Sequence, residues 1–363
     1  MFSTKLLVVL LAALVVIGTA SASGAGTVKN VSGKVWIDNV DRLQWGKGQD
    51  NSFISALTAA MRAIGEDVTY EYLMGVSGAA FRVQFLLPSG CPSSPDATCG
   101  FDCSVTAAKA LGYPLNFIGT SEDKPDEVKK TRAEIVESID KGNPVLAINL
   151  ISEADWGVII GYTNAGSDFL CWSYYDKSSR MSLAENWPWA VIIIGNKDKA
   201  PSRKASIIES FKTAQKVAET EKFGNYASGY SAFEAWIKHL QNEKEFKKLK
   251  ASDLGKSTHT NAWCYNSLID CRVAAVKYLR SIKGELSPSA AEHISKAADI
   301  YEQEVKLLAA GWDNAPYTWQ LEEGKSWTED MRKAEAETLK AAMELEKKAI
   351  SEIKAALAEA TKS

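Results

Sequence analysis

Apolar residues follow two different patterns along this chain, and the change between them lies near residue 200. Before that point, short runs of β-branched and aromatic residues stand between Gly, Pro, Asn and Asp, which is typical of β-strands. Two amphipathic helices are also expected there, at 52–64 and at about 125–141, the second closing on Gly142. Because the helices precede most of the strands, the order favours an α+β domain with an antiparallel sheet over alternating βαβ units. The expected strands lie within 28–37, 144–150, 156–163, 167–176 and 189–195.

After Lys199 the chain changes to Ala, Glu, Lys and Leu at helical spacing. Of the helices expected there, the one at 287–310 has the clearest signals at both ends. Ser287 can cap it, Pro288 suits its first position and Gly311 ends it. The last has an apolar stripe, which favours an antiparallel hairpin with 287–310; a dimerising coiled coil is the alternative. The expected helices are 203–222, 229–248, 261–283, 287–310 and 326–360, and the stripe is Leu339, Met343, Ile350, Ile353 and Leu357.

The first residues resemble a secretory signal peptide. Lys5 gives a positive start, an apolar run follows, and Ala20 to Ala22 supply small residues for cleavage. We therefore expect residues 1–22 to be removed and the protein to be secreted or periplasmic. The apolar run is shorter than the roughly 20 residues of a membrane-spanning helix, so stable membrane insertion is not expected, and a retained anchor is the alternative. The mature chain then divides into an α+β domain, 23–198, and a helical domain, 199–363.

Charge and histidine content narrow the possible partners. A net charge of -3 and a pI near 5.8 give no general attraction to nucleic acid or to anionic membranes. The three histidines, His239, His259 and His293, stand apart from one another and from the cysteines, so no zinc-ligand spacing occurs. We expect neither a metal nor a cofactor.

The six cysteines all lie after the predicted leader, where an oxidising compartment permits pairing. Cys91, Cys99 and Cys103 crowd into a loop rich in proline and small polar residues. We expect one disulfide there, most simply between Cys91 and Cys99, and free buried thiols are the alternative. Cys264 and Cys271 stand seven apart in one expected helix, about 10 Å along its axis, which is beyond disulfide reach and favours two core residues.

The stretch QDNSFISALTAAMRAIGEDVTYEYLMGVSGAAF, residues 49–81, carries a resemblance to known enzymes. Ser52 opens its first helix thirteen residues before Gly65. This arrangement resembles papain-like cysteine peptidases of the bacteriocin-leader-processing type and the N-terminal domain of butirosin-biosynthesis acyltransferases. In both, a cysteine opens the equivalent helix. The resemblance implies a papain-like domain over roughly residues 35–195, with the nucleophile exchanged for serine.

Three more positions of that resemblance can be assigned in this chain. Asp155 begins the run DWGVIIGY where the family has a histidine, and Asp176 closes FLCWSYYD where the family has an orienting carboxylate. Gln49 is the candidate for the oxyanion glutamine, although it lies closer to the nucleophile than in the family, whereas Gln44 lies somewhat too far. A serine hydroxyl is hardly ionised at neutral pH and an ordinary carboxylate is a poor base, so Ser52 with Asp155 makes a weak catalytic pair.

The helical half extends the resemblance. GNYASGYSAFEAWIKHL and NAWCYNSLIDCRVAAVKYL are similar to the helical domain of unknown function that follows the butirosin-type domain. In this part of the chain Gly229 and Ala232 permit close approach of another backbone, and Asn261 is expected to cap the helix that carries Trp263 and Arg272.

The leading functional hypothesis is a catalytically inactive protein that binds a small molecule or peptide in the ancestral cleft. One alternative is a serine-dependent amide hydrolase or acyltransferase using Ser52 with Asp155. Another is a structural or assembly role through the C-terminal helices, which would make the protein an oligomer. For Ser52 the simpler interpretation is a helix N-cap, although Asn51 or Asp50 could do the same, and for the tryptophans it is core packing. The candidate lining residues are Asn51, Ser52, Asp155, Trp156 and Tyr162.

Overall fold

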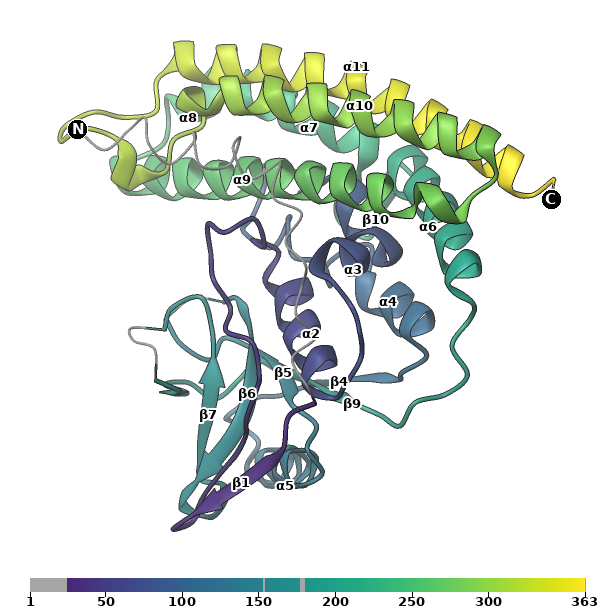
Figure 1. The fold of residues 1–363 in the computed structure, drawn as a ribbon. Helices are drawn as coiled ribbons and strands as arrows, with labels where there is room; N and C mark the ends of the chain where they lie inside the picture. The colour runs from purple at the N-terminus through teal and green to yellow at the C-terminus, as the bar shows by residue number, and fades with distance from the viewer. Residues whose placement is uncertain (1–24, 153, 177–179, 363) are drawn as a thin grey trace. The chain divides into compact units, whose positions relative to one another are not determined.

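The computed structural model describes residues 25–152, 154–176 and 180–362, which form two compact units (Figure 1). The sheet unit consists of 25–73 and 107–201. The helical unit consists of 74–106 and 202–362, so each unit is built from two separate stretches of sequence. The predicted leader, 1–22, lies outside the described residues.

Within the described residues, the sheet unit contains an eight-stranded antiparallel sheet whose main path runs β1-β2-β6-β5-β9-β4. Strand β7 pairs along one edge of β6, while β5 and β2 share the other edge. Strand β8 extends the sheet beyond β7. The predicted α+β class and the antiparallel sheet are confirmed. The strands are β1 (Val28–Val31), β2 (Lys34–Ile37), β4 (Leu115–Gly119), β5 (Val145–Ile148), β6 (Trp156–Thr163), β7 (Asp168–Trp172), β8 (Ser182–Leu183) and β9 (Ala190–Ile194).

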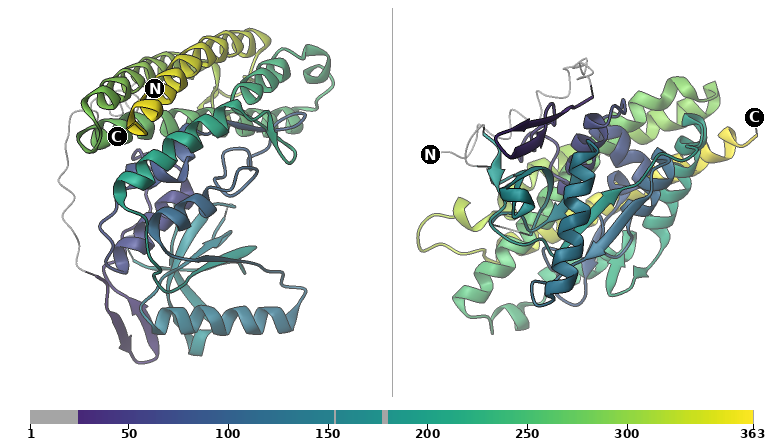
Figure 2. Two further views of the ribbon diagram at one scale, coloured as in Figure 1. Left: turned by 90° about the vertical axis from the view of Figure 1, so that its right-hand side faces the viewer. Right: turned by 90° about the horizontal axis from the view of Figure 1, so that it is seen from below.

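Two helices cover the sheet. Helix α2 (Ser52–Ala63) packs on β6 and β5 from one face, and α5 (Pro125–Asp140) packs on the other (Figures 1 and 2). Because both faces are covered, the central strand β6 is a continuous apolar run, buried over residues 156–161, in place of an alternating one. Gly65 after α2 and Gly142 after α5 have positive φ, as C-terminal glycines of helices do.

The helical unit contains long antiparallel helices. His293 on α10 contacts Glu352 on α11, and Tyr301 contacts Glu346, so the two helices run in opposite directions, which confirms the predicted hairpin. Ser287 caps α10 through the amide of Ala290, as expected. The helices are α6 (Arg203–Glu219), α7 (Gly229–Leu240), α8 (Glu243–Phe246), α9 (Ala251–Ile282), α10 (Pro288–Ala310) and α11 (Glu329–Ala360); α3 (Tyr70–Ser77) and α4 (Cys103–Leu111) each span the division between the units.

Two predictions about helix ends were wrong. The helix expected at 261–283 begins ten residues earlier, at Ala251, so Asn261 lies inside α9 and is not its cap. The helix expected at 229–248 is two helices, because the chain leaves α7 at Gln241 and Asn242 before α8 begins. Gly229 does permit close approach: a Cβ there would lie 2.0 Å from the carbonyl oxygen of Ala218.

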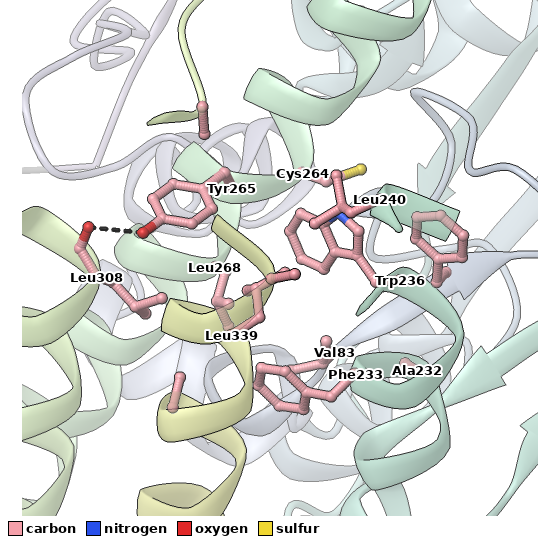
Figure 3. Close-up of a cluster of buried hydrophobic side chains, with 14 of the residues drawn as sticks. Val83, Ala232, Phe233, Trp236, Leu240, Cys264, Tyr265, Leu268, Leu308 and Leu339 are labelled. Carbon is pink, nitrogen blue, oxygen red and sulfur yellow. Dashed lines mark hydrogen bonds between the residues drawn. The ribbon is translucent and has the colours of Figure 1, made fainter. Parts of the chain in front are cut away.

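Residues 74–106 supply part of the core of the helical unit. Strand β3 (Gln84–Leu86) pairs with β11 (Tyr226–Ser228), which pairs in turn with β10 (Lys222–Phe223). Phe85 on β3 stacks on Trp236 of α7, with ring centroids 6.0 Å apart. Figure 3 shows the surrounding apolar cluster, in which the Tyr265 hydroxyl donates to the carbonyl of Leu308 at 2.8 Å.

Charged side chains are also buried in the helical unit. Arg272 on α9 is fully buried, and its Nη2 lies 2.7 Å from Glu346 while its Nε lies 3.2 Å from Glu304. Burial raises the pKa of Glu304 well above its usual range. Glu335, also fully buried, accepts two hydrogen bonds of 2.9 Å from the Asn261 amide, and burial raises its pKa as well.

Candidate functional site

The start of α2 is fixed by Asn51. Its side-chain oxygen accepts a hydrogen bond from the amide of Ile54 at 3.1 Å, with extended backbone dihedrals typical of an N-cap. The backbone amide of Asn51 in turn donates to the Tyr70 hydroxyl at 2.9 Å. Ser52 is therefore the first helical residue, and the interpretation of Ser52 itself as the cap was wrong.

Ser52 lies against the start of β6. The backbone amide of Trp156 donates to Ser52 Oγ at 3.2 Å, which joins two positions that are 104 residues apart in sequence. The contact is supported by Phe53, whose ring meets the Trp156 ring edge-on with centroids 5.5 Å apart. The half-buried hydroxyl of Ser52 is thus placed beside the residue that follows Asp155.

Asp155 is held at both its backbone and its side chain. Its carbonyl accepts from the amide of Asn149 at 3.1 Å, and its Oδ2 accepts from the Tyr175 hydroxyl at 3.1 Å. Tyr175 belongs to the turn after β7, where the Ser173 hydroxyl accepts from its amide at 3.0 Å. The carboxylate is half-buried, so a hydrogen-bond acceptor with a fixed position stands near Ser52.

Asp176 and Gln49 lie around the same turn. Asp176 Oδ2 accepts from the amide of Ser173 at 3.2 Å, and burial raises the pKa of this carboxyl above its usual range. The Gln49 side chain is exposed, while its backbone carbonyl accepts a hydrogen bond from the Tyr174 hydroxyl. The residue that contacts Asp155 is thus Tyr175 and not Asp176.

Tyr174 and Tyr175 were not predicted as site residues. From one turn, the Tyr174 hydroxyl donates to the carbonyl of Gln49 before α2, and the Tyr175 hydroxyl donates to Asp155 before β6. The adjacent tyrosines directly before Asp176 were the signal in the sequence, but no local pattern shows which distant residues a turn will contact.

Two of the candidate lining residues take no part in the exposed site. Trp156 is 1% exposed and packs in the core, so its ring offers no surface to a ligand and its candidate lining role is corrected. Tyr162 lies at the other end of β6, about 20 Å along the strand from Trp156, where its hydroxyl donates to Asp140 at 2.8 Å. The structure therefore places Ser52, with its cap Asn51, against the backbone of Trp156, the residue that follows Asp155.

The sheet unit also has a groove with a volume of about 400 Å³ between α5 and the strands β9 and β4, of which β4 forms the edge of the sheet. It is lined mainly by polar side chains, among them Asn116, Glu134 and Asn143. Ser52 and Asp155 do not line it. The groove is therefore a separate feature of the sheet unit.

The chemistry available to Ser52 is limited by its own unit. All three histidines of the chain belong to the helical unit, so no imidazole in the sheet unit can take a proton from Ser52. Among the described residues, no three His, Cys, Asp or Glu side chains are placed to hold a metal ion. The site offers a hydroxyl, a carboxylate and amide groups, which are groups that bind polar ligands.

The cysteines have free thiols in the described structure. Cys264 and Cys271 are buried, as expected of core residues, and burial raises the pKa of each thiol to about 12. Cys91 and Cys99 are partly exposed free thiols, so the expected bond between them is not formed here and its occurrence in the cell stays a prediction.

No known family model matches this chain, and no curated protein matches its sequence. None of the helices in the described ranges combines the length and the apolarity needed to cross a bilayer.

Proposed function

We propose that this is an exported, catalytically inactive protein with a papain-like sheet unit, which binds a small molecule or peptide beside Ser52 and Asp155. The observation that supports this best is the hydrogen bond from the Trp156 amide to Ser52 Oγ. It puts the start of α2 next to the start of β6, the two places where papain-like enzymes carry their cysteine and their histidine. Both places hold polar side chains with oxygen atoms.

The chemistry of the pair favours binding over catalysis. Asp155 accepts a hydrogen bond from Tyr175, and Ser52 accepts one from Trp156. Neither contact activates the serine, since a nucleophilic serine needs an adjacent base that removes its proton. A ligand with amide or ammonium donors would instead find a fixed carboxylate and a hydroxyl.

The hydrolase or acyltransferase alternative lacks a base of suitable strength in the sheet unit. The assembly alternative has also lost its main support, because most of the apolar stripe of α11 is buried within the chain, including Leu339, Ile350 and Ile353. Oligomer formation through the C-terminal helices stays a prediction.

A ligand screen tests the binding function. We expect some member of a panel of short peptides and polar metabolites to raise the melting temperature of the protein, and Asp155→Asn to abolish that shift. Asp140→Asn is the matched control, since Asp140 also accepts a tyrosine hydroxyl but at the far end of β6. If no ligand shifts the melting temperature, or if both variants lose the shift equally, the proposal fails.

The papain-like arrangement has a separate test that needs no ligand. In the double variant Ser52→Cys, Asp155→His, the thiol lies at a helix N-terminus beside an imidazole, and both features lower the pKa of a thiol. We expect iodoacetamide to alkylate this thiol at about pH 6 at least about tenfold faster than the thiol of Ser52→Cys alone. Equal rates in the two folded variants would mean that the two positions do not form a catalytic pair.

A further inference from the structure

An aromatic cluster lies on the helical unit. Trp319, in the short helix η6 (Thr318–Gln320), is 61% exposed, whereas Tyr317 directly before it is 1% exposed. Their rings are stacked, with centroids 4.2 Å apart and planes 9° from parallel. One indole face is thus covered by Tyr317, and the remaining surface of Trp319 is largely open to solvent.

Trp319 is held in position by Tyr317 and by the aromatic residues that Tyr317 contacts. Tyr317 packs against Trp263 of α9 at 6.4 Å and against Trp312 of η5 (Trp312–Asn314) at 6.0 Å, measured between ring centroids. The turn itself is closed twice: the Tyr317 amide donates to Gln320 Oε1 at 2.8 Å, and the Gln320 amide donates to the Tyr317 carbonyl at 2.9 Å. The exposed ring is therefore held in place before any partner binds, which lowers the entropy cost of binding.

The shape and the charge of the surface restrict what can bind there. Two rings 4.2 Å apart leave no space for a group between them, so the cluster is a flat platform and not a cage around a cation. Residues 311–325 contain three acidic residues, Asp313, Glu322 and Glu323, and one basic residue, Lys325, and this net negative charge disfavours nucleotides and other anionic rings. The exposed indole offers about 150 Å² at most, far below the roughly 1,000 Å² of a stable protein interface.

We propose that Trp319 is the stacking platform of a carbohydrate-binding site that takes a pyranose ring of a neutral polysaccharide. Such a ring has an apolar face of C–H groups that can cover the indole, and hydroxyls at its edge that need polar partners. His259 is placed to supply one, since its ring lies 5.5 Å from that of Trp319, and the exposed Gln320 is adjacent. This site is independent of the function proposed for Ser52 and Asp155.

Affinity electrophoresis tests the proposal, with native gels that contain hydroxyethyl cellulose, glycol chitin or soluble starch. The wild-type protein should be retarded in at least one gel, and Trp319→Ala should lower the affinity at least about tenfold, as the loss of one stacked ring does elsewhere. The matched control is Trp189→Ala, which removes a tryptophan that is 58% exposed in the sheet unit and should leave the retardation unchanged.

Two further variants show whether binding depends on a flat aromatic ring at position 319 or on any apolar side chain there. Trp319→Phe keeps a smaller flat ring and should retain part of the affinity, whereas Trp319→Leu is apolar without a flat face and should behave like Trp319→Ala. The proposal is overturned if the wild-type protein is retarded in none of the three gels, or if Trp319→Ala and Trp189→Ala migrate alike. It is also overturned if the protein binds neutral phosphatidylcholine vesicles through Trp319 and no polysaccharide.

Discussion

Arg272 is a fully buried arginine with two buried carboxylate partners. Its guanidinium reaches Glu304, Glu346 and the carbonyl of Ala80, the last at 2.9 Å. Tyr301 adds a hydrogen bond to Glu346 at 3.0 Å. One arginine thereby connects α9, α10 and α11 with the 74–106 segment, and burying it requires all of these partners at once.

Replacing this arginine should destabilise the protein strongly. We expect Arg272→Met to lower the free energy of unfolding by about 3–5 kcal/mol, because the carboxyls of Glu304 and Glu346 would stay buried without a cation. Arg280→Met, on the same helix, removes two ion pairs of an arginine that is 41% exposed and should cost under about 1 kcal/mol. Urea denaturation of both variants measures the difference, and similar losses would contradict the buried network.

At the scale of elements, the sequence predicts most where local signals and periodicity agree. The helix that begins after Ser287 and ends at Gly311 is predicted at both ends, because capping and proline signals lie within a few residues of each other. The start of α9 was missed because residues 251–260 contain Gly255 and several Ser and Thr, which have low helix propensity. Tertiary packing therefore decides where α9 begins, and it also decides that Asn261 lies inside the helix.

The buried pair of Asn261 and Glu335 makes stability depend on pH. The folded-state pKa of Glu335 lies well above its ordinary value of 4.5, so the folded chain retains a proton that the unfolded chain loses. The stabilising contribution is fully present below about pH 4.5 and is lost as the pH rises through the folded pKa, by up to about 1.4 kcal/mol per pH unit.

The variant Glu335→Gln should remove this dependence, since a glutamine stays neutral throughout. Between about pH 5 and pH 7, the free energy of unfolding of the wild-type protein should fall relative to that of the variant. Glu344→Gln, at an exposed position of the same helix, should keep the wild-type slope. Parallel pH profiles for wild type and Glu335→Gln would show that Glu335 is ionised in the folded protein.

At the scale of the whole molecule, the candidate site shows what a sequence can and cannot specify. The resemblance paired Ser52 with Asp155, and the structure places Ser52 against the next residue, Trp156. The contact of Tyr175 with Asp155 could not be predicted, because it depends on how the turn after β7 folds back over residues that are 20 positions away. Alternation and composition describe a strand or a helix, but they do not describe which turn lies over which strand end.

The two stretches of sequence that form the helical unit are separated by residues 107–201, and this affects how the unit can fold while the chain is being synthesised. Ribosomes make residues 74–106 early, yet β3 has to wait for β11, whose residue Ser228 pairs with Gln84. Until then Val83 and Phe85 have no partners from α7, so the nascent chain carries an exposed apolar segment while the whole stretch 107–201 is being translated. Pairings this distant in sequence form slowly, so the core of the helical unit can be completed only after residues 226–240 have been synthesised.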